Sequence, residues 1–360
     1  MANAQAATGL TVQQWDAKFY TEYVRQNRYR KYMGTDENAI IQLKEDLTKK
    51  KGDSVTFALL NRLTGEGTEG SDTLEGNEED LVSRSHKLTV NQIRHAVVVT
   101  VMEEQKSAIP LRNAARAALK VWIADKTRDG ITDAFASVDG VKYASATEVQ
   151  KDAWLVNNAD RVLFGAAKSN NSSNDHSASL GNIDNTNDKL TAASLSLLKR
   201  IATSANPKLR PVLTTEDEQW FIVYVNSLSF RDLKEDTTIK QAQREALPRA
   251  KTNPLFTGGD LVYDGMIVKE IEDIAILSGV GAGGIDVGPA YLCGAQAVGV
   301  GWAQRSKTVT QKKDYDDKMG VAVGEIRGIE KLTFGSGSED TDEPKDNGIV
   351  TGFFAAVADS

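Results

Sequence analysis

Two glycine patterns in the sequence have the spacing of a dinucleotide-binding loop. The matching residues are Gly65, Gly67 and Gly70, and Gly279, Gly281 and Gly284. Such glycines let backbone N–H groups and a helix N-terminus approach a pyrophosphate. The first pattern lies among carboxylates that would repel this ligand, and the second runs into the sequence IDVGP rather than a helix. We interpret both as turn glycines, so no cofactor is expected.

Metal-ligating residues are scarce. The chain contains one cysteine, Cys293, and three histidines, His86, His95 and His176, which are too few for a zinc site of the usual composition. The acidic pairs at 316–317 and 340–342 lack the ligand spacing of an EF-hand. We therefore expect solvated acidic loops and no metal.

Nucleophilic catalysis also lacks a sequence signature. The chain has no G-x-S-x-G motif, and Cys293 lies in the apolar run 291–300, where a buried, inert thiol is expected. A single cysteine cannot form an intrachain disulfide, which fits a reducing compartment. No catalytic residue is therefore assigned. Counting residues does not exclude a Ser–His–Asp arrangement, so a soluble α+β enzyme with an unrecognised site stays open as an alternative.

The composition is that of an ordinary globular protein. The 360 residues are 40% hydrophobic and 26% charged, with a formal net charge of -7. A chain of this length exceeds one compact core, so two subdomains with projecting arms are expected. The negative charge argues against a dedicated nucleic-acid binder. Neither a signal sequence nor a run of about 18 apolar residues occurs, so the sequence predicts a soluble, unsecreted protein with no membrane segment.

Residues 52–102 organise the rest of the sequence. Strand-forming residues at 54–63 and 87–101 flank a glycine-rich excursion. Between 64 and 84 this excursion carries 7 acids and 1 base, a local charge of -6. A two-stranded ribbon has exposed edges and little stability of its own, so we expect it to lie on a neighbouring copy of the chain.

The strings KKGDSVTF, LTGEGTEGSDTLEGNEEDL and LTVNQIRHAVV in this region resemble the extended-loop region of tailed-bacteriophage major capsid proteins, in the podophage-like group with the Hong Kong-type capsid fold. A second patch, WFIVYVNSLSFRDLKED through NPLFTGGDLVYDGMIVKEIED, is similar to a stretch of the same group in which a strand ends in a short Asp-Leu helix. The resemblance implies an α+β fold with an N-terminal arm, a long extended-loop β-hairpin, a peripheral domain with a spine helix, and a sheet-based axial domain.

Carried onto this sequence, the resemblance implies five segments. Residues 1–51 would form the N-terminal arm, 52–102 the extended loop, 103–206 the peripheral domain, 207–317 the axial domain, and 318–360 return strands with an acidic surface loop at 336–347. Apolar patterning predicts helices at 11–33, 36–50, 110–126 and 190–204. It predicts an exposed loop at 168–187 and strands at 220–225, 266–271, 291–300, 321–334 and 348–358.

The predicted helix at 11–33 carries an aromatic stripe, and residues 16–31 have 5 bases against 2 acids, a charge of +3. A solvated basic face over an aromatic stripe that packs on protein is the favoured interpretation. Contact of the bases with phosphate or with an acidic neighbour is the alternative. The candidate inter-subunit contacts on this arm and on the ribbon are Trp15, Phe19, Tyr23, Arg25, Arg28, Phe57, Arg62, Glu66, Glu69, Glu75, Glu78 and Glu79.

The resemblance implies a major capsid protein that assembles with itself, as hexamers and pentamers, into an icosahedral shell around the double-stranded DNA of a tailed phage. Scaffolding, portal and decoration proteins would be its further partners, and DNA would meet the inner face without sequence specificity. The protein would be located in the virion capsid after assembly in the host cytoplasm. An encapsulin-type compartment shell is the alternative within the same fold.

The sequence also bears on how such a shell is closed. Some members of this fold join subunits covalently through a lysine on the extended loop, but residues 52–86 contain Arg62 and Arg84 and no lysine. Arginine stays protonated and is a poor nucleophile, so it cannot replace that lysine. We therefore expect closure by non-covalent contacts.

Overall fold

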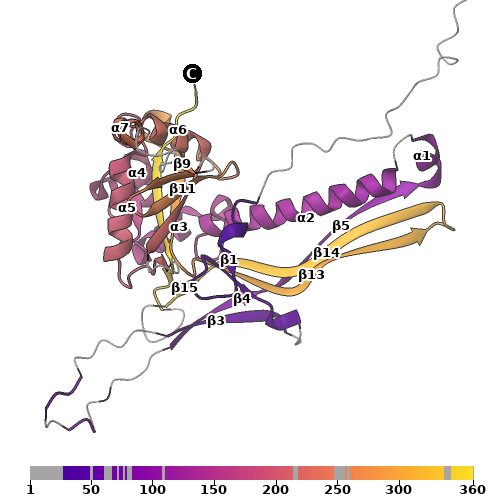
Figure 1. Cartoon of the computed structure of the whole chain (residues 1–360), viewed down its shortest axis with the longest axis horizontal. Coiled ribbons are helices and arrows are strands. Elements are labelled where there is room, and N and C mark those ends of the chain that lie inside the picture. The colour runs from indigo at the N-terminus through magenta and orange to yellow at the C-terminus, as the bar shows by residue number, and fades with distance from the viewer. Residues whose placement is uncertain are drawn as a thin grey trace, which may run out of the picture. The chain divides into compact units, whose positions relative to one another are not determined.

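The structure, a computed structural model, describes residues 27–48, 52–60, 67–70, 73–75, 78, 83–107, 110–213, 218–246, 256–257, 260–335 and 342–359 (Figure 1). The chain divides into two compact units. In the described part, the smaller unit contains Gln92–Thr127 and Gln304–Ile326, and the larger contains Arg28–Asn91, Arg128–Ala303 and the chain from Arg327 onward.

In its described residues, the smaller unit contains the short helix α1 (Val101–Lys106), part of a long helix and parts of three strands. It holds the first part of α2 (Leu111–Ala136), the strand β5 (Asn91–Thr100), and the outer parts of β13 (Val298–Lys313) and β14 (Lys318–Lys331). Leu119 and Ile123 of α2 pack against Val321 and Val323 of β14. These spacings of four on a helix and two on a strand each bring apolar side chains to one face. The helix predicted at 110–126 is confirmed, although it continues to Ala136.

A five-stranded sheet has the order β1 (Met33–Gly34), β2 (Ile41–Lys44), β13, β14, β5. β2 runs parallel to β1 and to β13, with Ile41 opposite both Met33 and Val298. A short helix, α1 (Val101–Lys106), follows β5 directly, and the Thr100 side chain caps it by accepting a hydrogen bond from the Glu103 N–H at 3.2 Å.

An eight-stranded sheet lies within the larger unit. Its order is β6 (Val162–Phe164), β17 (Ile349–Ala355), β12 (Val287–Cys293), β8 (Gln219–Val225), β11 (Met266–Glu270), β10 (Asp260–Tyr263) and β9 (Phe256–Thr257), and β7 (Val212–Leu213) also pairs with β8. β8 runs parallel to β11 and antiparallel to β12. Its strands come from segments assigned above to both the peripheral and the axial domain.

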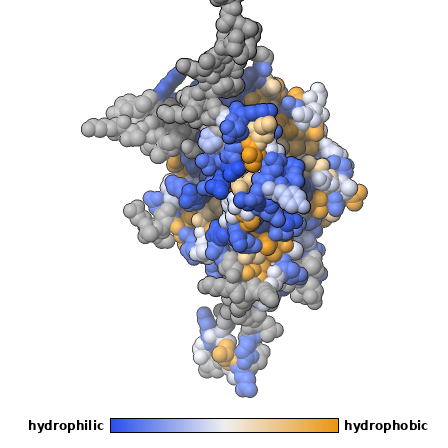
Figure 2. Space-filling model, turned by 90° about the vertical axis from the view of Figure 1, so that its right-hand side faces the viewer, coloured by the Kyte–Doolittle hydropathy of each residue, from blue (hydrophilic) through white to orange (hydrophobic). Residues whose placement is uncertain are grey.

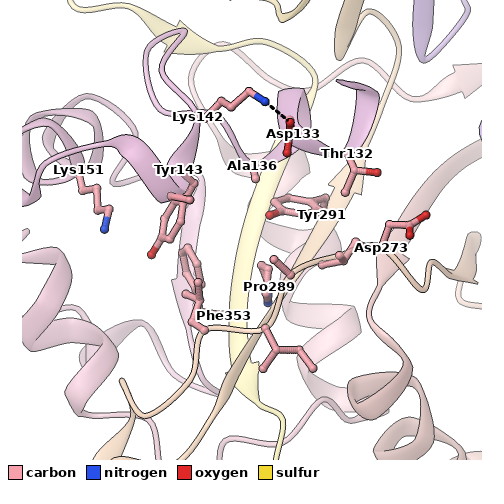
Figure 3. Close-up of a pocket in the computed structure, with 15 residues that line it drawn as sticks. Thr132, Asp133, Ala136, Lys142, Tyr143, Lys151, Asp273, Pro289, Tyr291 and Phe353 are labelled. Carbon is pink, nitrogen blue, oxygen red and sulfur yellow. Dashed lines mark hydrogen bonds and ion pairs between the residues drawn. The ribbon is translucent and has the colours of Figure 1, made fainter. Parts of the chain in front are cut away.

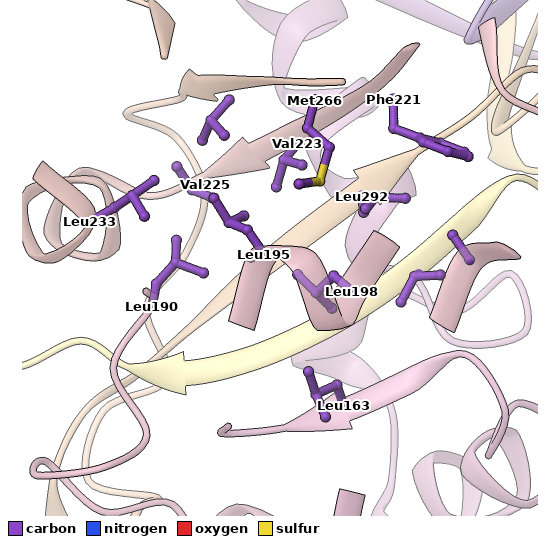
Figure 4. Close-up of a cluster of buried hydrophobic side chains, with 14 of the residues drawn as sticks. Leu163, Leu190, Leu195, Leu198, Phe221, Val223, Val225, Leu233, Met266 and Leu292 are labelled. Atoms are coloured by element: carbon purple, nitrogen blue, oxygen red, sulfur yellow. The ribbon is translucent and has the colours of Figure 1, made fainter. Parts of the chain in front are cut away.

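The main core packs on both faces of β8. Phe221, Val223 and Val225 join the cluster beneath the helix α5 (Ala192–Ser204), which Figure 4 shows with Leu195 and Leu198 against the sheet. The alternate residues Ile222 and Tyr224 join a second cluster with Phe135, Tyr291 and Val298. Because both faces are covered, the strand reads as a continuous apolar run, and the prediction of a buried central strand at 220–225 is confirmed.

The remaining elements are short. The helices are α3 (Glu148–Asn157), α4 (His176–Gly181), α6 (Ser227–Glu235) and α7 (Thr237–Ala246), and the strands are β3 (Ser54–Leu60), β4 (Ser83–Thr89), β15 (Thr333–Phe334) and β16 (Lys345–Asp346). Short 3-10 turns occur at Arg30–Tyr32, Asp46–Thr48, Tyr143–Ser145, Lys168–Asn170 and Ala282–Gly284. Thr147 and Gln150 form a capping box on α3, and Asn226 caps α6. The predicted helix at 190–204 and the strands at 266–271 and 348–358 are confirmed by α5, β11 and β17.

Three local predictions are wrong. The helix expected at 36–50 is instead β2 followed by the turn Asp46–Thr48, because Ile40, Ile41 and Gln42 are buried in succession between neighbouring elements. The helix expected at 11–33 is wrong only at its described end, where the 3-10 turn Arg30–Tyr32 is followed by β1, while residues 11–26 lie outside the described residues. The loop expected to be exposed at 168–187 contains α4, which Asp175 caps and whose His176 and Leu180 are buried.

A fourth prediction, one strand over 291–300, is wrong because the chain breaks between β12 and β13. Gln296 has a positive φ of 55°, and the backbone N–H groups of Gly294 and Ala295 donate to Gly348 and Arg210 rather than to a sheet ladder. A Cβ at Gly294 would lie 2.3 Å from the Arg210 carbonyl oxygen. The apolar run therefore serves two strands in two different sheets.

Candidate inter-subunit surfaces

The ribbon predicted from the sequence is present as an antiparallel pair, β3 and β4. Val55 lies opposite Leu88 and Phe57 opposite His86. The return arm, however, does not continue in this pair to residue 101. After Thr89 the chain enters β5, which belongs to the five-stranded sheet. The alternation of 87–101 was consistent with one long strand because both pieces are extended.

Phe57 is not available for a neighbouring subunit, which corrects its assignment as an inter-subunit contact. Its side chain is 1% exposed and packs with Leu88, Leu332 and Phe334 of the same chain. The close approach depends on Gly299, where a Cβ would lie 2.9 Å from the Phe57 ring. The ribbon was expected to lie on a neighbouring copy, but at its base β15 and Leu332 of the same chain cover one face of it.

The acidic candidates farther along the ribbon are exposed where the structure describes them. Glu69, Glu75 and Glu78 all have exposed side chains. They can therefore meet a second molecule without rearrangement of a core. The candidates that lie outside the described residues are Trp15, Phe19, Tyr23, Arg25, Arg62, Glu66 and Glu79.

Arg28 contacts its own chain. Its Nη1 donates to the Glu270 carbonyl oxygen at 3.0 Å and lies 3.9 Å from Asp260 Oδ1, while the side chain keeps 41% exposure. The next residue, Tyr29, is fully buried, and its hydroxyl lies 2.9 Å from Thr132 Oγ1. Burial raises the pKa of Tyr29 above its usual value. This anchor was missed because the aromatic spacing of the arm was assigned only as far as Tyr23.

A buried ion pair also escaped the sequence analysis. Lys331 Nζ lies 2.9 Å from Asp346 Oδ2, with both side chains 3% exposed, and Trp154 Nε1 donates to the same oxygen at 3.0 Å. Asp346 had been placed on an acidic surface loop at 336–347, and this is wrong for that residue. The ion pair joins β14 to β16, and the Trp154 N–H joins α3 to the same carboxylate. A local sequence pattern could not predict the pair because Lys331 and Asp346 belong to different strands.

A cavity of about 310 Å³ lies in the larger unit (Figure 3). Its wall includes the rings of Tyr143, Tyr291 and Phe353, and its charged groups are paired, with Lys142 Nζ 2.7 Å from Asp133 Oδ2. No serine, cysteine or histidine is among the side chains that line it. The side chains that line this cavity therefore include no Ser–His or Cys–His pair.

A buried histidine, His176, contacts Tyr143, one of the residues that line this cavity. The Tyr143 hydroxyl lies 3.2 Å from His176 Nε2. Burial lowers the pKa of His176 to about 4 and raises the pKa of Tyr143. Both groups are therefore neutral at pH 7, and the fully buried imidazole has no path to a substrate.

Other ligand sites were sought among the described residues. No group of three or more His, Cys, Asp or Glu side chains in that part of the chain is placed to hold a metal ion. None of the described helices is long and apolar enough to cross a membrane. Figure 2 shows one face of the chain, on which the described residues are mostly hydrophilic and apolar ones form small separate areas. Contacts between copies over this face would therefore be mainly polar.

The chain is similar to known proteins over nearly its whole length. A family model described as "Phage capsid protein" matches residues 3–357. The major capsid protein of Pseudomonas phage KPP25 is 29% identical over 366 residues, which cover 95% of this chain and 94% of that protein. Among solved structures, the cyanophage Pam1 capsid asymmetric unit has a TM-score of 0.88 and 33% identity, with 100% of both chains covered. The capsid of Ralstonia phage GP4 has a TM-score of 0.77 and 23% identity, again over 100% of both chains.

These likenesses, together with the α+β fold, define a structural protein of phage shells. The chain belongs to the phage capsid protein family. It is a major capsid protein, associates with itself into a shell, and forms the virion capsid. The family and the α+β capsid fold predicted from the ribbon and the second patch are thereby confirmed.

Proposed function

We propose that this major capsid protein builds an icosahedral shell of hexamers and pentamers around the double-stranded DNA of a tailed phage, with the Hong Kong-type fold, and that non-covalent contacts alone close the shell. It has no enzymatic role. Assembly takes place in the host cytoplasm, with scaffolding and portal proteins as partners, decoration proteins on the outer surface, and DNA in non-specific contact with the inner face.

The observation that carries this proposal is the extent of the likeness to a capsid asymmetric unit, with 100% of both chains covered at a TM-score of 0.88. Every part of this chain thus has a counterpart in a chain that forms a shell. The five-segment division, with arm, extended loop, peripheral and axial domains and return strands, is part of the same proposal. So are the contact roles of Arg28, Glu69, Glu75 and Glu78 and of the candidates outside the described residues.

We base non-covalent closure on residues 52–86 of the extended loop; the one lysine of the 52–102 segment, Lys87, lies in β4 opposite Thr56. Residues 52–86 contain no lysine that could attack a side-chain carbonyl of a neighbour. Apolar burial, backbone pairing and exposed ion pairs remain as the sources of cohesion. An exposed pair contributes about 1 kcal/mol or less, so the strength of a shell must come from repetition over many copies.

Electron microscopy of the purified chain, expressed with its scaffolding partner, tests the shell. Closed particles with five-fold and six-fold capsomers are expected, and a soluble small oligomer under all assembly conditions would contradict the proposal. Boiling the particles in SDS tests the closure. One band near 39.1 kDa, or slightly below if the N-terminus is trimmed, is expected, whereas a ladder of multimers would show covalent cross-links.

A further inference from the structure

The outer half of β13, Gln304–Lys313, is exposed throughout, on both faces of the strand. In the sheet β13 lies between β2 and β14. The recorded pairing with β2 covers only Val298–Gly301, before the outer half begins. Among the described residues, this half therefore has a strand beside one edge and none beside the other.

The same stretch is strongly basic. Its sequence, QRSKTVTQKK, contains four cations and no acid. Because side chains alternate along a strand, Arg305, Lys307 and Lys313 share one face with Val309, which is 51% exposed. Lys312 lies on the opposite face, where its Nζ is 2.8 Å from Asp316 Oδ2. One face of the outer half thus carries three cations around an exposed apolar side chain.

This charge pattern selects the kind of partner. Lysines on a sheet edge discourage pairing with another copy of the same edge, because like charges would meet. The same cations favour an acidic segment. The edge therefore disfavours contact with the same basic edge of a neighbouring copy and favours contact with an acidic segment of that copy. An edge of this length without such selectivity would be prone to uncontrolled association.

The chain itself supplies an acidic segment of matching character. Glu66, Glu69, Asp72, Glu75 and Glu78 place a carboxylate at every third position. Of these, Glu69, Glu75 and Glu78 lie in the described residues and are exposed. Gly67 and Gly70 have positive φ values of 76° and 69°, so the backbone departs from a regular strand at these two described positions. Side-chain ion pairs, rather than a continuous backbone ladder, would make the contact.

We propose that the basic face formed by Arg305, Lys307 and Lys313 is the docking surface for the acidic segment of a second copy of this chain. The inference rests on the proposed shell, since it identifies the surface that receives the ribbon. Each ion pair at such an exposed surface is weak, but the contact repeats with every copy and its effect accumulates over the lattice.

Charge reversal tests the pairing. Lys307→Glu with Lys313→Glu is expected to lower the yield of closed particles by about tenfold at about 0.15 M salt, because every copy carries the defect. Glu69→Lys with Glu75→Lys should have the same effect, and the four changes together should restore particles. The control, Lys168→Glu with Lys208→Glu, makes an equal charge change at two exposed lysines and should assemble like the wild type. Normal particles from either reversed pair, or no recovery in the combined variant, would overturn the proposal.

A cysteine pair tests whether the contact joins two copies. The native thiol of Cys293 is 0% exposed and does not compete for oxidation. In Lys307→Cys with Glu75→Cys, oxidation of assembled particles should give disulfide-linked multimers on a non-reducing gel, and either single variant should stay monomeric. A monomer band alone from the double variant would refute docking between copies. Failure of the wild type to form particles would instead count against the proposed function, so the two failures are distinguishable.

Discussion

Replacing Lys331 by methionine should destabilise the larger unit more than any surface charge change. The substitution keeps most of the apolar stem and removes the cation that lies 2.9 Å from Asp346 Oδ2. The Asp346 carboxylate, 3% exposed, would then keep the Trp154 N–H as its hydrogen-bond donor but lose its direct ion-pair partner, with Arg161, which donates to the Asp346 carbonyl oxygen, left as the neighbouring cation. An uncompensated buried charge costs far more than the net contribution of the intact pair.

The magnitude follows from the burial of both partners. Breaking a buried pair by removing one member costs about 3–5 kcal/mol. With an unfolding entropy of about 2.1 cal/mol/K per residue, a chain of 360 residues has about 0.76 kcal/mol/K, so the melting temperature should fall by about 4–7 °C. Lys318→Met is the matched control, because the Lys318–Asp314 pair at 2.7 Å is 44% and 53% exposed. An exposed, solvent-screened pair contributes little to stability, so Lys318→Met should melt close to the wild type.

Thermal unfolding of unassembled subunits, followed by circular dichroism, measures both variants. Adding Asp346→Asn to Lys331→Met should recover most of the loss, because the neutral amide leaves no buried charge. If Lys331→Met melts within about 1 °C of the wild type, or no lower than Lys318→Met, then the pair is not buried as described and the reasoning fails.

Two further outcomes can be measured on the same subunits. Burial holds the pKa of His176 near 4, below the value of 6.5 in an unfolded chain. The stability linked to the neutral imidazole is therefore fully present above pH 6.5. It is lost as the pH falls toward 4, and the free energy of unfolding should be lower by about 2–3 kcal/mol at pH 4.5. Urea unfolding at pH 7 and pH 4.5 should show this loss in the exposed-site control His95→Gln and less of it in His176→Gln; equal losses would contradict it. Gly294→Ala would place a Cβ 2.3 Å from the Arg210 carbonyl oxygen, whereas the site of Gly181→Ala is open. We expect the first to lower the urea midpoint clearly and the second to leave it nearly unchanged, and similar midpoints would refute the steric argument.

The elements predicted best from the sequence are those whose signal is local. Pro110 marks the start of α2, and the apolar spacing after it gives the helix and its buried side. The run at 220–225 gives a central strand because an element covered on both faces needs apolar residues at every position. The ordered strings of the ribbon and of the second patch were sufficient to assign the family.

The contacts of the ribbon could not be predicted in this way. Phe57 has the spacing of a strand residue, but no local pattern says whether a neighbour or its own chain covers it, and Leu332 and Phe334 lie far away in sequence. The same limit explains the break at Gly294, which exists because the Arg210 carbonyl approaches from another segment.

Charge was misassigned for a related physical reason. Asp346 was predicted to be solvated because it follows a run of acids, and burial of a lone carboxylate is costly. The tertiary structure supplies Lys331 and Trp154 as partners, which makes burial tolerable. The sequence by itself thus determined the family, the strongest helices and strands, and the net charge of each segment. Only the tertiary structure decided which charges are paired and which apolar faces are covered within the same chain, and which are left exposed to another copy. The reason is that the partners of these groups are brought together by folding.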